Sequence, residues 1–234
     1  TKNLIVCWTR LRSPRAVSSI SIGLKAGRWT VDALRARFEG TRPPDDPLDV
    51  VMPPGLARWP HGMRKQLVGP LRPAGVLVPI MRRADRLSIL LTQRAAHLKI
   101  HAAQASFPGG RMEDDDADVR ATALRETHEE IGVEPNFVEV IGYLHSMPTI
   151  TGFAVTPVVG LIEGDVELVI DRTEVDYTFE VPLDFLLDES NDEMIDREWE
   201  GKTFRLKEFH YDGERVWGAT AYMLLAFREY LLNK

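Results

Sequence analysis

The fold of this chain is decided by one stretch, Phe107-Pro-Gly-Gly-Arg-Met-Glu-Asp-Asp-Asp-Ala-Asp-Val-Arg-Ala-Thr-Ala-Leu-Arg-Glu-Thr-His-Glu-Glu-Ile-Gly-Val133. Its first residues predict a glycine turn, and its second half predicts a helix. Asp116 or Asp118 can cap that helix, because a short acidic side chain accepts hydrogen bonds from the first free backbone N–H groups. Gly132 suits the position just after the last turn, where the backbone becomes left-handed.

The predicted helix carries three glutamates on one face. Glu126, Glu129 and Glu130 stand at positions i, i+3 and i+4, so their like charges repel. Mg²⁺ or Mn²⁺ is expected to gather them, because hard cations prefer carboxylate oxygens and bridge to substrate phosphates. The carbonyl of Gly110 can add a ligand if the glycine turn folds back on the helix. Arg125, next to the cluster, can hold a glutamate through a bidentate pair.

Glutamates at this spacing on an isolated helix most often form a solvated face. Here the glycine turn, the order Arg-Glu-x-x-Glu-Glu-x-Gly and the apolar frame occur together. The segment resembles the Nudix box, Gly-x5-Glu-x7-Arg-Glu-x-x-Glu-Glu-x-Gly. The resemblance implies a metal-dependent pyrophosphohydrolase with Arg125, Glu126, Glu129 and Glu130 in the catalytic set. It leaves open which glutamate is the base.

The elements around this segment predict an α/β fold. Five stretches have the pattern of strands: 75–81, 87–92, about 137–145, 152–163 and 177–181. Asp212-Gly213 indicates a further hairpin, and apolar spacing predicts a closing helix over 218–232. Strands mixed with two substantial helices favour helices that cover a central sheet. The resemblance implies a Nudix-type α/β/α sandwich with a mixed central sheet.

Residues 1–60 differ in character from the rest. Thr30 or Asp32 can cap a short helix over 29–38, and six prolines between 40 and 60 indicate an irregular connection. We therefore divide the chain into an N-terminal extension over 1–60, with a short helix and a Pro-rich linker, and a Nudix hydrolase domain over 61–234.

The box departs from the standard pattern at one place. The segment between Gly110 and Arg125 is one residue longer, and Ala117 stands where the first acid is expected. Three acids are alternatives for the role of pairing with the arginine: Asp116, which we favour, Glu113 and Asp118. The insertion is similar to that of one Nudix subgroup, the coenzyme A diphosphatases, whose box begins Phe-Pro-Gly-Gly-Lys-x-Asp/Glu-x-x-Asp-x-Asp.

The stretch 90–107 resembles a second motif of the same subgroup, Leu-Leu-Thr-x-Arg-Ser-x3-Arg-x3-Gly-x3-Phe-Pro-Gly-Gly. Its register is preserved, and three positions differ: Ala95, Lys99 and Ala103. The resemblance implies that Arg94 and Lys99 bind phosphates of coenzyme A, although Lys lacks the planar fork of Arg. The alternative for both is a solvated strand end.

Three further residues have an ordinary and a functional interpretation. Glu174 is a possible extra carboxylate, because Nudix enzymes often draw another acid from a loop outside the box; the alternative is an ordinary loop acid. Trp217 is interpreted as a scaffold aromatic rather than a base-stacking platform. His101 is interpreted as a packing residue rather than a general base. The resemblance covers about 74–232.

Charge and cysteine content limit the partners and the setting. A net charge of −6 and a pI near 5.6 argue against a nucleic-acid or membrane binder, whereas a small anion bound through metal is compatible. A single cysteine, Cys7, argues against a disulfide framework and fits the cytoplasm. The first 28 residues hold basic residues and no acid, which is also the composition of an organelle transit segment. The sequence does not indicate the oligomeric state.

The function expected from these features is hydrolysis of the diphosphate linkage of coenzyme A or acyl-CoA to 3′,5′-ADP and (acyl-)4′-phosphopantetheine. One alternative is a Nudix hydrolase of another nucleoside diphosphate conjugate, such as ADP-ribose or a dinucleotide. Another is a catalytically silent Nudix module that binds a nucleotide, against which the complete glutamate set argues. A third, mRNA decapping, predicts a basic RNA path that the acidic balance does not support.

Overall fold

The computed structural model describes residues 29–53, 55–98 and 103–232. Its large sheet is organised around β1 (Arg72–Arg82) and β7 (Phe153–Glu163), which run parallel along their full length. The other strands pair antiparallel, in the order β3-β2-β1-β7-β5, with β4 on β1, β6 on β7 and β8 on β2. They are β2 (Leu87–Arg94), β3 (Ala105–Ser106), β4 (Gly109–Arg111), β5 (Val138–Tyr143), β6 (Met147–Pro148) and β8 (Val175–Pro182). All five predicted strands are confirmed, and the sheet is mixed.

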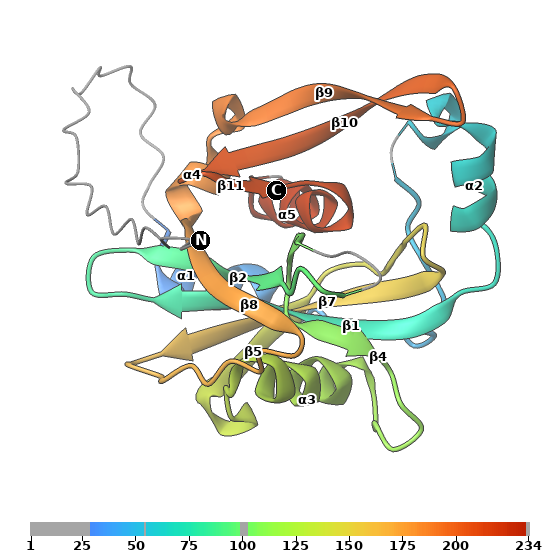
Figure 1. Ribbon diagram of the computed structural model, residues 1–234. Helices are drawn as coiled ribbons and strands as arrows, with labels where there is room; N and C mark the ends of the chain where they lie inside the picture. The colour runs from blue at the N-terminus through green and yellow to red at the C-terminus, as the bar shows by residue number, and fades with distance from the viewer. Residues whose placement is uncertain (1–28, 54, 99–102, 233–234) are drawn as a thin grey trace, which may run out of the picture.

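Both faces of the large sheet are covered, which is why its central strands are apolar on both sides. On β1, Leu77 packs in the layer of α3 (Val119–Ile131), whereas its neighbour Val78 packs in the layer of α5 (Gly218–Leu232). Figure 1 shows α3 below the sheet and α5 above it. The predicted α/β sandwich with a mixed central sheet is therefore confirmed.

The two ends of α3 are fixed by the residues that the sequence singles out. The side chain of Asp118 caps the helix by accepting a hydrogen bond from the backbone N–H of Ala121 at 2.8 Å. Gly132 ends it in the left-handed region, with φ of 74°. Of the two proposed capping residues, Asp118 is the cap, and Asp116 is left for another role.

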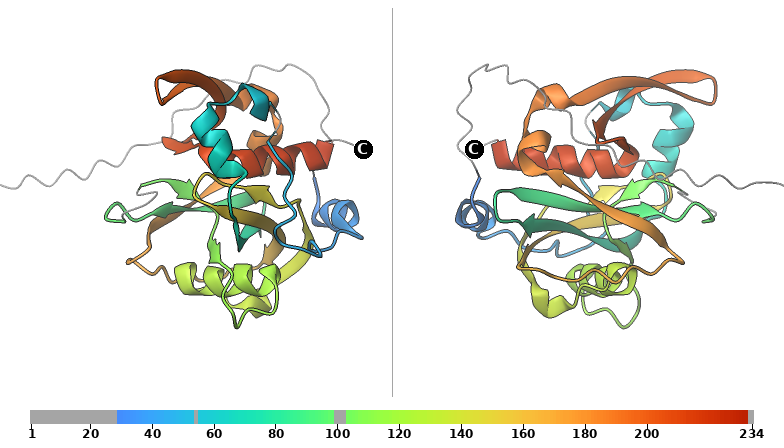
Figure 2. Two further views of the ribbon diagram at one scale, coloured as in Figure 1. Left: turned by 90° about the vertical axis from the view of Figure 1, so that its right-hand side faces the viewer. Right: turned by 60° about the vertical axis from the view of Figure 1, so that its left-hand side comes forward.

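A second sheet lies on the far side of α5. Its strands β9 (Asp192–Trp199), β10 (Lys202–Tyr211) and β11 (Glu214–Val216) pair antiparallel in the order β11-β10-β9. Figures 1 and 2 show it arching over α5, so that this helix lies between two sheets. The hairpin at Asp212-Gly213 is confirmed. Strand β9 was not predicted, because its few apolar residues do not alternate and Met194 is exposed.

The part of the chain before the large sheet contributes to the core. Helix α1 (Val31–Phe38) is capped by Thr30, and its Leu34 and Phe38 are fully buried. The ring of Phe38 stacks on Tyr230 of α5, with centroids 4.7 Å apart. The short helix is thus confirmed, whereas a domain boundary at 60/61 stays a prediction.

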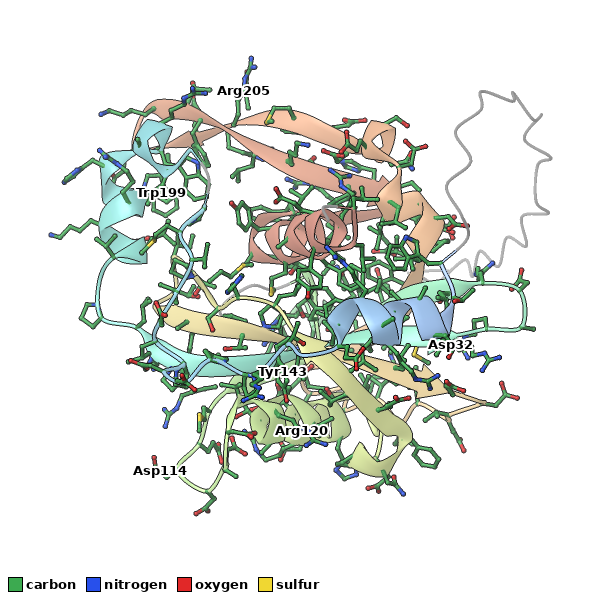
Figure 3. All side chains as sticks on the ribbon, turned by 180° about the vertical axis from the view of Figure 1, so that it is seen from behind. Asp32, Asp114, Arg120, Tyr143, Trp199 and Arg205 are labelled. Carbon is green, nitrogen blue, oxygen red and sulfur yellow. The ribbon has the colours of Figure 1, made fainter. Side chains whose placement is uncertain are left out.

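Several short elements complete the fold. They are the 3-10 helices η1 (Leu56–Arg58), η2 (Pro135–Phe137) and η3 (Glu189–Asn191), and the helices α2 (His61–Leu67) and α4 (Leu183–Leu187). Figure 3 shows Trp199, at the end of β9, beside α2. Across the described residues, no helix is long and apolar enough to cross a membrane. The basic segment 1–28, with Cys7, lies outside the described residues.

Gly75 sets how closely α3 approaches the sheet. A Cβ at this position of β1 would overlap the carbonyl oxygen of Val119, in the first turn of α3. We expect Gly75→Ala to lower the free energy of unfolding by about 1–3 kcal/mol, because backbone atoms on both sides must move apart. Denaturant unfolding measures the change. Gly69→Ala is the matched control, since its Cβ would meet its nearest neighbours at an ordinary 3.4 Å. Equal stability of the two variants would contradict the packing argument.

Candidate functional site

Four segments meet at the C-terminal half of α3. They are α3 itself, the glycine turn that leads into β4, the end of β2, and the loop before β8. On α3, Glu130 is almost completely buried, with 3% of its surface exposed, whereas the side chain of Glu129 is 54% exposed. The glutamates therefore form a row that runs from the interior of the protein to solvent.

Arg125 ties this row to the lengthened turn. Its Nε donates to Oδ1 of Asp116 at 3.0 Å and its Nη2 to Oδ2 at 2.9 Å, a bidentate pair. Its Nη1 also donates to Glu126 and Glu129, each at 3.0 Å. Asp116 therefore takes the role for which Glu113 and Asp118 were its rivals. The hydrogen-bonded guanidinium lowers the pKa of Asp116 to about 2.

Two further hydrogen bonds, from a threonine that the sequence did not single out and from the backbone of Glu113, also hold Asp116 in place. The hydroxyl of Thr122, one turn into α3, donates to its Oδ2 at 3.0 Å, and the backbone N–H of Glu113 donates to the same oxygen at 2.9 Å. A threonine six residues after an acid gives no recognisable sequence signal, so only the folded turn reveals it.

The predicted glycine turn is wrong in one respect, because Gly109 and Gly110 lie in strand β4 after a bend at Pro108. The two glycines allow the sheet to approach the glutamates closely. In β4, Gly110 pairs with Gly75 of β1. A Cβ at Gly110 would lie 2.5 Å from Cδ of Glu126, and a Cβ at Gly109 would lie 2.5 Å from the carbonyl oxygen of Gly75. The backbone of Gly109 also forms a hydrogen bond with Glu130. Glycine is therefore required at both positions if the carboxylates are to sit against the turn.

Glu130 is a buried carboxylate with too few hydrogen-bond and charge partners to replace the water that it loses on burial. Its Oε2 has no hydrogen-bond partner, and its Oε1 lies 3.6 Å from Nη1 of Arg94. Burial raises the pKa of Glu130 to about 8, and the negative charges of Glu174 and Glu126 act in the same direction. Burial raises the pKa of Glu126 as well. A group of this kind marks a site where a cation would replace the lost solvation.

The loop before β8 brings Glu174 to this site. The backbone carbonyl of Glu174 accepts a hydrogen bond from Ala95 at 2.8 Å, and Asp171 of the same loop donates to the carbonyl of Glu130 at 3.0 Å. The charge of Glu174 acts on both Glu126 and Glu130. The extra carboxylate that the sequence suggested thus lies with the cluster.

The donor set is suited to a divalent cation. The carboxylates of Glu126 and Glu129 share the guanidinium of Arg125, the carboxylate of Glu126 lies against Gly110, and the buried Oε2 of Glu130 has no hydrogen-bond partner. Oxygen donors of this kind are the ligands that hard divalent cations prefer. Among the described residues, no three Asp, Glu, His or Cys side chains already stand in a ligand arrangement. The guanidinium of Arg125 holds Glu126 and Glu129 instead. The donor types therefore fit a metal ion, and the side chains of Glu126 and Glu129 would have to turn away from Arg125 to bind it.

Not every predicted residue can be placed. Arg94 lies at the cluster, against Glu130. Lys99 and His101 lie outside the described residues. Trp217 is half-buried, and the guanidinium of Arg215 lies 5.0 Å from its ring centroid.

The family of the chain follows from comparison with known proteins. A model described as the NUDIX domain matches residues 71–221, which hold the whole cluster and both glycine positions. The chain belongs to the Nudix family. Nudix hydrolases cleave a phosphoric anhydride in nucleoside-diphosphate-linked substrates, and this chain is an enzyme of that class. The Nudix box is the glycine turn and α3.

Two relatives carry the same printed name, uncharacterized Nudix hydrolase NudL. The protein of Escherichia coli O1:K1 / APEC is 44% identical and that of Enterobacter sp. (strain 638) is 42% identical, each over 64% of this chain and 78% of the relative. Among solved structures, a MutT/nudix family protein from Enterococcus faecalis is similar over 69% of this chain and 62% of its own, with 19% identity and a TM-score of 0.46.

The Asp116–Arg125 pair gives a prediction for stability. We expect Asp116→Asn to lower the free energy of unfolding at pH 7 by about 1.5–3 kcal/mol, the usual value of hydrogen bonds to a charged group. The folded pKa of about 2 lies below the ordinary 3.8, so this stabilisation is present above pH 4 and is lost as the pH falls towards 2. Denaturant unfolding at several pH values measures both effects.

The matched control is Asp114→Asn, because Asp114 is an exposed acid of the same loop (Figure 3). We expect it to leave stability unchanged. A loss in Asp116→Asn that persists at pH 2, or an equal loss in both variants, would contradict the assigned pairing.

Proposed function

We propose that this chain hydrolyses the diphosphate linkage of coenzyme A or acyl-CoA, releasing 3′,5′-ADP and (acyl-)4′-phosphopantetheine, with Mg²⁺ or Mn²⁺ as cofactor. The observation that carries the choice of substrate is the lengthened turn, in which Asp116, and no residue at the standard position, pairs with Arg125. An insertion at this place is the feature in which the box resembles the coenzyme A diphosphatases. The motif over 90–107 supports the same choice.

The proposed metal ligands are Glu126, Glu129, Glu130 and the carbonyl of Gly110. When bound, a divalent cation neutralises the diphosphate and lowers the pKa of a water molecule that attacks phosphorus. Arg125 is proposed to orient the carboxylates of Glu126 and Glu129, since it donates hydrogen bonds to both. Glu174 is proposed as a further carboxylate of the same site.

The proposed substrate contacts are Arg94 and Lys99, because their positive charges would attract an anionic substrate. Arg94 ends β2 beside Glu130, so a guanidinium lies within reach of a diphosphate held at the glutamates. We place the activity in the domain over 61–234 and, on the single cysteine, in the cytoplasm.

A substrate panel tests the choice of molecule. With Mg²⁺ or Mn²⁺, we expect coenzyme A and acetyl-CoA to be hydrolysed faster than ADP-ribose or diadenosine polyphosphates, with 3′,5′-ADP as the product seen by chromatography. Turnover of ADP-ribose or a dinucleotide without turnover of coenzyme A would support the other nucleoside diphosphate conjugates. Binding of these compounds without any turnover would support the silent module.

Replacement of Glu130 tests the role of the buried carboxylate. We expect Glu130→Gln to lower Mg²⁺-dependent turnover on the order of 100-fold or more. The same change should raise the melting temperature of the metal-free protein at pH 8. The folded pKa of about 8 exceeds the ordinary 4.5, so the wild type loses stability as the pH rises from about 4.5 to about 8, and the amide removes that penalty.

Activity assays and thermal melts at pH 5 and pH 8 measure these two effects. The stabilisation should be small at pH 5, where the carboxyl group of the wild type is protonated in the fold. Undiminished turnover would exclude Glu130 as a ligand, and a lower melting temperature at pH 8 would exclude an uncompensated buried charge.

A further inference from the structure

Arg94 is held in place by its backbone. It is the last residue of β2, where the register with β8 shifts between Gln93 and Arg94. Its N–H donates to the carbonyl of Gln104 at 3.0 Å, and its own carbonyl accepts from Ala103 at 3.2 Å. The backbone of Arg94 is therefore fixed beside the glutamates, and any movement of its guanidinium must come from rotation about the side-chain bonds.

The contact that this guanidinium makes with Glu130 is poorly satisfied on both sides. Nη1 lies 3.6 Å from Oε1 of Glu130, which is longer than a hydrogen bond. The Nε of Arg94 is buried without a hydrogen-bond partner, and so is the Oε2 of Glu130. Two buried polar atoms are thus left without partners at a single ion pair, an arrangement that native proteins rarely keep.

Permanent ion pairs elsewhere in the described chain look different. Asp116 and Arg125 form a bidentate pair at 3.0 and 2.9 Å. Arg228 donates to Asp192 at 2.7 Å, although their side chains are only 7% and 2% exposed. These pairs are short, whereas the contact between Arg94 and Glu130 is long and incomplete. The guanidinium of Arg94 therefore partly neutralises the charge of Glu130, but few hydrogen bonds would be lost if another cation took its place.

We infer that Arg94 is an exchangeable counter-charge of Glu130: its guanidinium neutralises the buried carboxylate until a divalent cation replaces it, and the released guanidinium then binds the diphosphate of the substrate. The inference rests on the proposed metal role of Glu130. Both cations are attracted to the same carboxylate and repel each other, so their binding to it is competitive. Arg94 is in this sense a substrate-binding residue that couples metal binding to binding of the anion.

The exchange makes two opposite predictions for one variant. Without Arg94 the metal has no competitor, so Arg94→Gln should bind Mn²⁺ more tightly, by about 5- to 100-fold. The diphosphate loses a guanidinium partner, so the KM for coenzyme A should rise. A purely structural ion pair predicts the reverse for the metal, because its loss would loosen Glu130 and weaken Mn²⁺ binding.

The experiment is a Mn²⁺ titration of the full chain without substrate, followed by electron paramagnetic resonance of the free ion. It compares the wild type with Arg94→Gln, Arg83→Gln and Glu130→Gln. Arg83 is the matched control, since it pairs with Glu180 on the same sheet and its replacement changes the net charge equally. We expect tighter binding in Arg94→Gln, no change in Arg83→Gln and loss of binding in Glu130→Gln.

The outcomes separate the two proposals. Wild-type Mn²⁺ affinity in Glu130→Gln would overturn the proposed metal site itself. Loss of binding there, together with unchanged or weaker binding in Arg94→Gln, would overturn only the exchange. Tightening of equal size in Arg83→Gln would also overturn it, because general charge would then explain the effect.

A measurement on the wild type keeps the inference testable if Arg94→Gln fails to fold. The Nε–H proton of Arg94, identified by its absence in Arg94→Lys, can be followed by nuclear magnetic resonance. Nε is buried while Nη1 faces Glu130, so release of the guanidinium should expose Nε and make its exchange with water faster when Mg²⁺ is added. An exchange rate that Mg²⁺ leaves unchanged would contradict release of the guanidinium.

Discussion

The close approach of α3 to the sheet is the constraint on which the site depends. At Gly75, Gly109 and Gly110 a single added carbon would collide with backbone or with a glutamate. Because these positions are bare, the helix rests directly on β1 and β4, and its glutamates reach the turn. A larger side chain at Gly75 would push α3 away from β1, one at Gly109 would push β4 away from β1, and one at Gly110 would displace the carboxyl group of Glu126.

The charged groups that meet where α3 approaches the sheet differ in how well they are paired. The lengthened turn supplies Asp116, which satisfies Arg125 from one side, and Arg125 holds Glu126 and Glu129 from the other. This arrangement keeps the outer carboxylates ordered. Glu130 lies deeper, Arg125 does not bond to it, and its Oε2 has no hydrogen-bond partner. The site thus combines satisfied charges at its rim with an unsatisfied one inside, a separation that favours binding of a cation at the inner position.

Much of this arrangement could be predicted from the sequence, because it is local. Helix α3, its left-handed end at Gly132 and the row of glutamates follow from spacing within a single segment. The sequence favoured Asp116 but left Glu113 and Asp118 open, since the choice depends on how the inserted residue is accommodated in the turn. The contact of Arg94 with Glu130 joins β2 to α3 and has no local signal. Strand β9 was missed for a similar reason, because its partner β10 rather than its own pattern defines it.

The parallel pairing of β1 with β7 affects how the molecule assembles. Arg72 pairs with Phe153, and β2, β4, α3 and β5 all lie between them in the chain. Parallel pairing over such a distance forms slowly, because a long loop must close before any contact repays its entropy. The hairpin of β1 and β2 needs only a short turn and can form early. Helix α3 packs mainly on β1 and β4 and only slightly on β7. A nascent chain that ends before β7 therefore carries the whole box but lacks the strand that pairs with β1 along its full length.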